Sequence, residues 1–172
     1  MIRRVHVGNG QTSEALYSPC GAYRYALTRA WDDRGPRLLY LLLNPSTATE
    51  AQNDPTISRC QKRANLLGYG SFRVVNLFAF RATDPADLKQ SSDPIGPQNR
   101  VALRESTLDW RPELVICGWG VHGSHLGQSA KVRHLLQDWG IPLWHLGLTQ
   151  SGEPRHPLYI AYSVAPMPWG PL

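Results

Sequence analysis

Cysteine is scarce in this sequence, and its few cysteines stand too far apart to form a metal centre. Cys20, Cys60 and Cys117 are the only cysteines in 172 residues, whereas zinc and iron–sulfur sites use cysteines separated by a few residues. Cys60 and Cys117 lie in apolar patterns and are expected in the core. Most of the histidines are scattered and show no metal spacing. We therefore predict no metal site and no cofactor.

Long apolar runs are also absent. No stretch approaches the roughly 20 apolar residues that a membrane-spanning helix needs, and residues 1–20 lack the apolar core of a signal peptide. We therefore expect a cytoplasmic protein that has no membrane partner, and we expect it to be a monomer. An apolar content of 42% beside a charged content of 18% is typical of a folded domain.

Three widespread enzyme motifs are missing as well. The sequence contains no P-loop, no G-x-G-x-x-G loop and no G-x-S-x-G turn. This disfavours an NTPase, a Rossmann dehydrogenase and a serine hydrolase. What the chain does have is an excess of positive charge, with a net charge of +5 and a pI near 9.4. That excess modestly favours a polyanionic partner bound through a basic surface, and DNA is the partner that the resemblance described below implies.

The alternation of apolar and helical segments predicts the fold. Four apolar stretches have the length and composition of buried strands: 38–43, 72–78, 113–119 and 142–148. Helical patterns separate them, at about 55–67, 97–109 and 125–139. This order predicts a single α/β domain over residues 1–172, a three-layer α/β/α sandwich around a mainly parallel central sheet of at least four strands.

The N-terminal part is harder to place. Residues 23–29 alternate between apolar and polar types, which is typical of an edge strand with one face in water. Residues 1–22 are polar and contain glycine, so we expect them to form a loose arm.

Polar residues gather where the four predicted strands end. In parallel sheets, ligands bind outside the carboxyl ends of the strands. Four separate clusters at one rim therefore predict a site there. The clusters are Asn44-Pro45-Ser46, Asn76 with Phe78 and Arg81, Gly118-Trp119-Gly120 with His122, and Arg155-His156-Pro157.

Several of these residues have a simpler structural interpretation beside the functional one. Asn44 and its neighbours are common turn residues, yet Asn44 is also suited to hold a water molecule, although an amide cannot remove a proton from it. Asp54 before Pro55 is typical of a helix N-cap. The functional alternative is that Asp54 acts as a general base.

The same choice arises further along the chain. Asn76 interrupts an apolar strand, so it is either paired in the structure or aimed into a pocket, where an amide could read a base edge. Phe78 is either core or a platform on which a base stacks. Trp119 is either core or close to a ligand. His156, held in an extended loop, can donate a hydrogen bond to a leaving group.

Segments spread along the chain resemble a known but uncharacterised family. They include "LLLNPSTA", "NDPTISRC", "VVNLFAFR", "ICGWGVHG" and "GEPRHPLY". Together they resemble a bacterial and phage family of unknown function with an LNPSTA signature, over about residues 16–165.

A more distant resemblance is to the uracil-DNA glycosylase superfamily, which implies a fold like that of those enzymes. It implies that Asn44 positions the hydrolytic water, that Asn76 reads the base and that His156 contacts it. "RHPLY" is similar to the superfamily's His-Pro-Ser loop, with Leu158 in place of the serine. Residues expected to contact DNA through this loop are Arg155, Pro157, Leu158 and Tyr159.

These inferences lead to one expected function and two alternatives. We expect a DNA glycosylase-like enzyme that hydrolyses the N-glycosidic bond of a flipped, uracil-like or modified base. Asn44, Asp54 and His156 would be catalytic. Substrate binding would fall to Pro45, Ser46, Asn76, Phe78, Arg81, Trp119 and Gly120. No acidic residue directly follows the first strand, which favours the alternative of a non-catalytic nucleic-acid or nucleotide-binding module. The other alternative is a nucleoside-processing enzyme of phage or base-modification metabolism.

Overall fold

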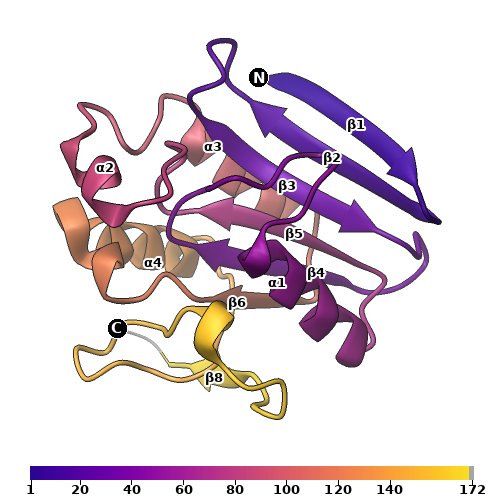
Figure 1. The fold of residues 1–172 in the computed structure, drawn as a ribbon. Helices are drawn as coiled ribbons and strands as arrows, with labels where there is room; N and C mark the ends of the chain where they lie inside the picture. The colour runs from indigo at the N-terminus through magenta and orange to yellow at the C-terminus, as the bar shows by residue number, and fades with distance from the viewer. Residues whose placement is uncertain (171–172) are drawn as a thin grey trace.

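The computed structural model describes residues 1–170, and its strands form one eight-stranded sheet (Figure 1). The strand order across the sheet is β1-β2-β3-β5-β4-β6-β7-β8. The strands are β1 (Ile2–Gly8), β2 (Gln11–Tyr17), β3 (Arg24–Ala30), β4 (Arg37–Leu42), β5 (Ser71–Asn76), β6 (Leu114–Cys117), β7 (Leu143–His145) and β8 (Met167–Trp169). The α-helices are α1 (Pro55–Leu66), α2 (Pro85–Gln90), α3 (Asn99–Arg104) and α4 (Gln128–Asp138). Shorter helical segments are the π-helical η1 (Glu105–Asp109) and the 3-10 segments η2 (Val121–Gly127) and η3 (Pro157–Tyr159).

The expected mainly parallel α/β/α sandwich is wrong, because the sheet is mixed. The pairs β1–β2, β2–β3, β3–β5 and β7–β8 are antiparallel, and only β4–β5, β4–β6 and β6–β7 are parallel. The four apolar stretches do supply the parallel strands. Antiparallel strands then extend the sheet at both edges. The outermost of these, β1 and β8, are exposed or short, so they contain no apolar run that the sequence could reveal.

Residues 1–22 do not form a loose arm, because residues 2–17 make the β1–β2 hairpin. The two strands pair in continuous register from Ile2 with Tyr17 to Gly8 with Gln11. Asn9 and Gly10 make the turn with φ of 54° and 70°. Positive φ at both central residues is the backbone of a type I′ hairpin turn, which matches the twist of the strands. The following strand, β3, is not an edge strand either, because β2 and β5 flank it.

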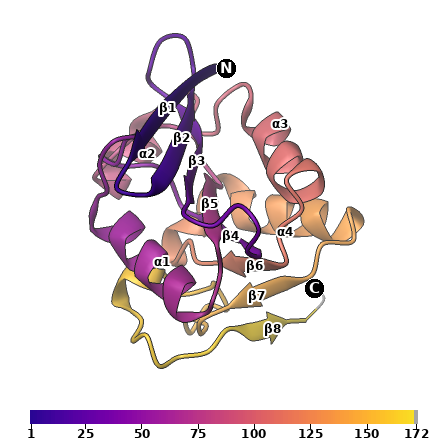
Figure 2. The same cartoon turned by 90° about the vertical axis from the view of Figure 1, so that its right-hand side faces the viewer.

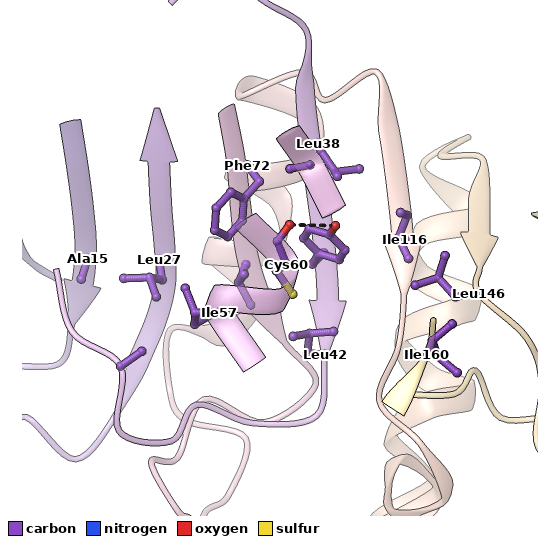
Figure 3. Packing of buried hydrophobic residues seen from close by; sticks show 14 of the residues in the cluster. Ala15, Leu27, Leu38, Leu42, Ile57, Cys60, Phe72, Ile116, Leu146 and Ile160 are labelled. Carbon is purple, nitrogen blue, oxygen red and sulfur yellow. Dashed lines mark hydrogen bonds between the residues drawn. The ribbon is translucent and has the colours of Figure 1, made fainter. Parts of the chain in front are cut away.

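The apolar run of β4 is buried on both faces of the sheet. Leu38, Tyr40 and Leu42 belong to the cluster beneath α1, which also contains Ile57 and Cys60 (Figure 3). The alternate leucines belong to the cluster on the opposite face, where α3 and α4 pack (Figure 2). Full burial of each leucine contributes roughly 1.5–3 kcal/mol. The period-two alternation therefore places β4 at the centre of the core.

Helix α1 begins as the sequence predicts. Asp54 caps it, with the side chain accepting a hydrogen bond from the Ile57 amide at 2.8 Å, and Pro55 occupies the first turn. The helix is tied to the sheet where the Tyr40 hydroxyl donates to the Cys60 carbonyl at 3.2 Å (Figure 3). These contacts fix the start of α1 beside the carboxyl end of β4.

Helix α1 also holds the C-terminal segment. The buried Arg63 side chain donates to the carbonyl oxygens of Ile160, Ala161 and Val164 at 2.9–3.0 Å. Arg59 donates to the Ile160 carbonyl at 2.6 Å. This segment leads on to β8. No helix in the described part of the chain combines the length and apolar character needed to cross a membrane.

Candidate functional site

The candidate site lies where the chain changes direction across the sheet. From β4 the chain passes through α1 to β5 on one side, and later through α3 to β6 on the other. The two connections cover opposite faces, since α1 and α3 contribute to different core clusters. In α/β sheets, ligands commonly bind at such a switch point, outside the carboxyl ends of the strands. Polar groups from the ends of β4 and β5 and from the loop after β7 surround this position.

Asn44 follows β4 directly and is held by the loop after β5. Its amide nitrogen donates to the Ala82 carbonyl at 2.7 Å and to the Pro45 carbonyl at 3.0 Å. The adjacent Ser46 hydroxyl lies 3.3 Å from that of Thr83. These contacts orient the Asn44 amide. Its side-chain oxygen has no hydrogen bond among the described residues and remains an acceptor for water.

Asn76 ends β5 as a buried amide without a partner. The residue is 2% exposed, and its side-chain nitrogen has no hydrogen-bond partner within residues 1–170. Phe72 and Val74 of the same strand face α1, so the period-two alternation directs Asn76 to that face too. An unpaired buried polar group destabilises a protein by about 1–3 kcal/mol. A ligand acceptor would remove this penalty.

Asp54 is fully engaged as a helix cap. One carboxylate oxygen accepts from the Ile57 amide at 2.8 Å, and the other accepts from the Ala48 amide at 3.3 Å. The cap interpretation from the sequence is therefore confirmed. Neither oxygen is left free of a backbone donor, although the negative charge still acts on its surroundings.

His156 accepts a backbone hydrogen bond at one ring nitrogen, and its pKa is lowered by burial. Burial lowers its pKa from 6.5 to about 4, and the nearby Asp54 charge only partly opposes this shift. Its Nδ1 accepts a hydrogen bond from the Leu158 amide at 3.3 Å. Since an accepting nitrogen carries no proton, the neutral ring has its proton on Nε2. His156 can therefore donate from Nε2 at neutral pH.

Gly118 lets the His156 loop reach the sheet. A Cβ atom at this position would lie 2.8 Å from the Pro157 Cδ atom and 3.2 Å from the Arg155 carbonyl oxygen. It would also lie 3.3 Å from a methyl group of Leu42 in β4. The loop therefore packs directly on the ends of β4 and β6. The next glycine, Gly120, also binds this segment, because its amide donates to the Pro154 carbonyl at 2.8 Å.

Arg24 is a site residue that the sequence interpretation missed. It is buried, and burial lowers its pKa to about 10, while Asp54 and Tyr17 act in the opposite direction. Its guanidinium donates to the Ala48 carbonyl, and its Nε has no partner among the described residues. Asp54 thus acts electrostatically on both Arg24 and His156, which places the three groups near one another.

A β-bulge explains why Arg24 faces inward. The register between β2 and β3 shifts at this point, so that Tyr17 pairs with Arg24 and Leu16 with Ala26. The extra residue, Tyr25, packs with Ala79 and Ala102. A bulge re-aims the side chains on either side of it. The alternation of apolar and polar residues in "RYALTR" therefore could not show that Arg24 is buried.

The structure does not bring every predicted residue into this group. Phe78 is buried in the cluster on the opposite face of the sheet. Trp119 is buried as well, with its indole N–H donating to Glu153 and its ring 5.5 Å from that of Trp169. Arg81 lies over the Tyr17 ring at 5.6 Å and donates to the Gly21 carbonyl. Phe78 and Trp119 therefore belong to the core, and Arg81 is held by the segment between β2 and β3.

The residues expected to contact DNA lie at the rim. Arg155 is exposed, Pro157 is buried against Gly118, and Leu158 is half-buried. Tyr159 is 77% exposed, and its ring centroid lies 6.2 Å from that of His156. Within residues 1–170 no group of histidine, cysteine and acidic side chains could hold a metal ion.

Comparison with known proteins gives a single finding. The model of the family described as "Protein of unknown function (DUF1643)" matches residues 24–158. This range begins at Arg24 and includes Asn44, Asp54, Asn76 and His156. No curated protein and no solved structure matches the chain. The resemblance to a family of unknown function is therefore confirmed, and that to the uracil-DNA glycosylase superfamily stays a prediction.

Proposed function

The chain belongs to the DUF1643 family, and we propose that its site recognises a nucleobase in DNA and hydrolyses the N-glycosidic bond that holds the base. The observation that carries this proposal is Asn76, whose amide is buried at 2% exposure with its nitrogen unpaired. An amide offers one donor and one acceptor group side by side. It therefore complements a base edge that offers an acceptor and a donor, as the edge of uracil does.

Departure of the base is the step that His156 would assist. Cleavage of an N-glycosidic bond leaves negative charge on the base and an oxocarbenium-like sugar. A neutral histidine that donates from Nε2 stabilises this negative charge without a change in its own protonation. Its low pKa keeps the ring in the donating, neutral form at physiological pH. The base must leave the DNA stack to reach this position, which takes a few kcal/mol that pocket contacts offset.

Attack by water is the step that Asn44 would assist. Its fixed amide has a free side-chain oxygen that can accept a hydrogen bond from water. An amide cannot take the proton at neutral pH. The oriented water therefore adds to the oxocarbenium-like sugar, and the proton that it loses neutralises the departed base anion. The negative charge of Asp54 near His156 would further favour the positively charged sugar.

The test is a search for base excision. Duplexes that carry uracil, hypoxanthine or modified pyrimidines are incubated with the protein and then treated with alkali, which breaks the strand at abasic sites. We expect breaks at one or more of these bases. Asn44→Ala and His156→Gln should each reduce the rate by 100-fold or more, on the order of 3 kcal/mol in barrier. The matched control His134→Gln, at an exposed histidine, should retain the wild-type rate. Absence of breaks on every duplex would refute excision.

A second function is favoured by a specific observation, the structural role of Asp54. Both of its carboxylate oxygens accept backbone hydrogen bonds that hold the start of α1, so this carboxylate already serves the fold. This arrangement favours a module that binds DNA or a nucleotide without cleaving it. Such a module would bind a base-containing ligand in the Asn76 pocket and release no base. Binding to DNA should weaken steeply with salt, whereas binding to a nucleoside should hardly change.

A further inference from the structure

A polar cavity lies outside the site described above, between the β1–β2 hairpin, β3 and the start of α1. Its volume is about 340 Å³, which is within the usual size range of small-ligand sites. No carboxylate lines it. The lining residues are His6, Gly8, Asn9, Gln11, Ser13, Arg29, Ala51, Asn53 and Gln61.

Arg29 brings a buried positive charge to this cavity. The residue is 1% exposed and forms no ion pair with a carboxylate in the described chain. Its guanidinium donates instead to the Thr49 carbonyl at 2.6 Å and to the Asn53 side-chain oxygen at 2.9 Å. Glu50 and Asp54 act on it from a greater distance, but neither lines the cavity. Its charge therefore raises the electrostatic potential inside the cavity.

A chain of side-chain amides leaves the wall rich in free donors. Asn53 donates to the Gln61 oxygen at 2.8 Å, Gln61 donates to the Gln11 oxygen, and Gln11 donates to the Ser13 hydroxyl at 3.0 Å. Every amide oxygen in this chain already accepts a hydrogen bond, including that of Asn53, which accepts from Arg29. What remains free is one N–H group on each amide and the hydroxyl hydrogen of Ser13.

We propose that this cavity binds a phosphate group of the DNA strand whose base enters the Asn76 pocket. A phosphate presents acceptor oxygens and negative charge, which complements a wall of free donors around a buried arginine. Arg4 and His6 pair with Ala15 and Ser13, so they face the same side of the hairpin as the cavity, which His6 lines.

The cavity and the base site share one wall. The loop between β4 and α1 carries Asn44 and Asp54 toward the base site, and its residues Ala51 and Asn53 line the cavity. Arg24 and Arg29 of β3 bind carbonyl groups of this loop. A strand with its phosphate in the cavity would therefore lie beside the base site. This inference rests on the proposed function for its occupant.

The test adds a negative charge to the cavity with little change of shape. Gln61→Glu is compared with the control Gln150→Glu, which makes the same charge change at an exposed turn residue. The probe is a fluorescent 15-base-pair duplex without any modified base, and anisotropy gives its Kd between 50 and 200 mM NaCl. Gln61→Glu should raise Kd at least tenfold above the control. It should also reduce the slope of log K against log salt by about 1, the contribution of one phosphate.

Equal binding by the two variants would overturn the proposal, as would wild-type protein that does not bind the duplex. If Gln61→Glu lowers the melting temperature, the Kd of Asn9→Asp is compared with that of Gln150→Glu instead. Aspartate tolerates the positive φ of this exposed turn, so Asn9→Asp should keep the fold. The probe contains no target base, so the result does not depend on excision. If Gln61→Glu weakens DNA binding but the wild-type protein excises no base, only the catalytic proposal is refuted. If the wild-type protein excises a base but Gln61→Glu binds DNA as tightly as the control, only the phosphate site is refuted.

Discussion

At the scale of single residues, two buried donors lack partners at the same end of the sheet. The Asn76 amide nitrogen and the Arg24 Nε are both buried without a described acceptor. Asn99 lies nearby, and its amide nitrogen donates to the carbonyls of Asn76 and Leu77 at 3.0 Å, while its own side-chain oxygen is buried without a described partner. The Asn99 nitrogen therefore stabilises the backbone, whereas the Asn76 nitrogen has no described acceptor.

Replacement of Asn76 should stabilise the protein. Asn76→Leu removes the unpaired nitrogen and keeps a similar volume, so the free energy of unfolding should rise by about 1–3 kcal/mol. Urea denaturation measures this difference. The matched control Asn99→Leu removes two hydrogen bonds to backbone carbonyls and should lower the free energy of unfolding by a similar amount. A destabilised Asn76→Leu would indicate that Asn76 has a structural role.

His156 should make stability depend on pH in a definite window. The folded-state pKa of about 4 lies below the ordinary value of 6.5, so the unfolded chain binds the proton more tightly. Stability therefore falls as pH falls from 6.5 to 4, by roughly 3 kcal/mol in total. The difference between wild type and His156→Gln, measured by urea unfolding across this range, should shrink with falling pH. The exposed-site variant His134→Gln is the matched control, and identical profiles for wild type and His156→Gln would contradict the assignment.

At the scale of elements, the sequence predicted those whose pattern is strong and local. The apolar run of β4 and the Asp54-Pro55 start of α1 are confirmed, because burial on both faces and helix capping leave clear signals. The β1–β2 hairpin was not predicted, although Asn9-Gly10 is a typical type I′ turn. Strand β1 is exposed along nearly its whole length, so it carries no apolar pattern from which burial could be inferred.

The contact between Gly118 and the His156 loop offers a test at this scale. Gly118→Ala would place a Cβ atom 2.8 Å from Pro157 and 3.2 Å from the Arg155 carbonyl, so the loop must shift. Overpacking of this kind destabilises a protein by about 1–3 kcal/mol, and displacement of His156 should also remove activity. Gly170→Ala, where a Cβ atom meets nothing within 4 Å, is the control. Crystal structures would show the shift, and an unmoved loop would contradict this account.

At the scale of the whole molecule, the shared rim of the polar clusters after β4 and β5 was predictable, but the sheet around them was not. The polar clusters after β4 and β5 do lie at one rim, because parallel strands deliver their carboxyl ends together. Phe78 and Trp119 were harder to place, since sequence periodicity does not show on which face a fully buried aromatic ring packs. The burial of Arg24 depends on a β-bulge, and the antiparallel edges of the sheet depend on pairing between distant segments. Neither feature leaves a local signal in the sequence.

Release of free base shows whether Asn76 reads a base whose N-glycosidic bond is then hydrolysed. Duplexes carrying uracil, hypoxanthine or modified pyrimidines are incubated with wild-type protein and with Asn76→Leu, and mass spectrometry detects the free base. Wild-type protein should release the base, and Asn76→Leu should release it at least 100-fold more slowly, although that variant should be the more stable fold. No free base from any duplex, or release by Asn76→Leu at the wild-type rate, would rule out this role of Asn76.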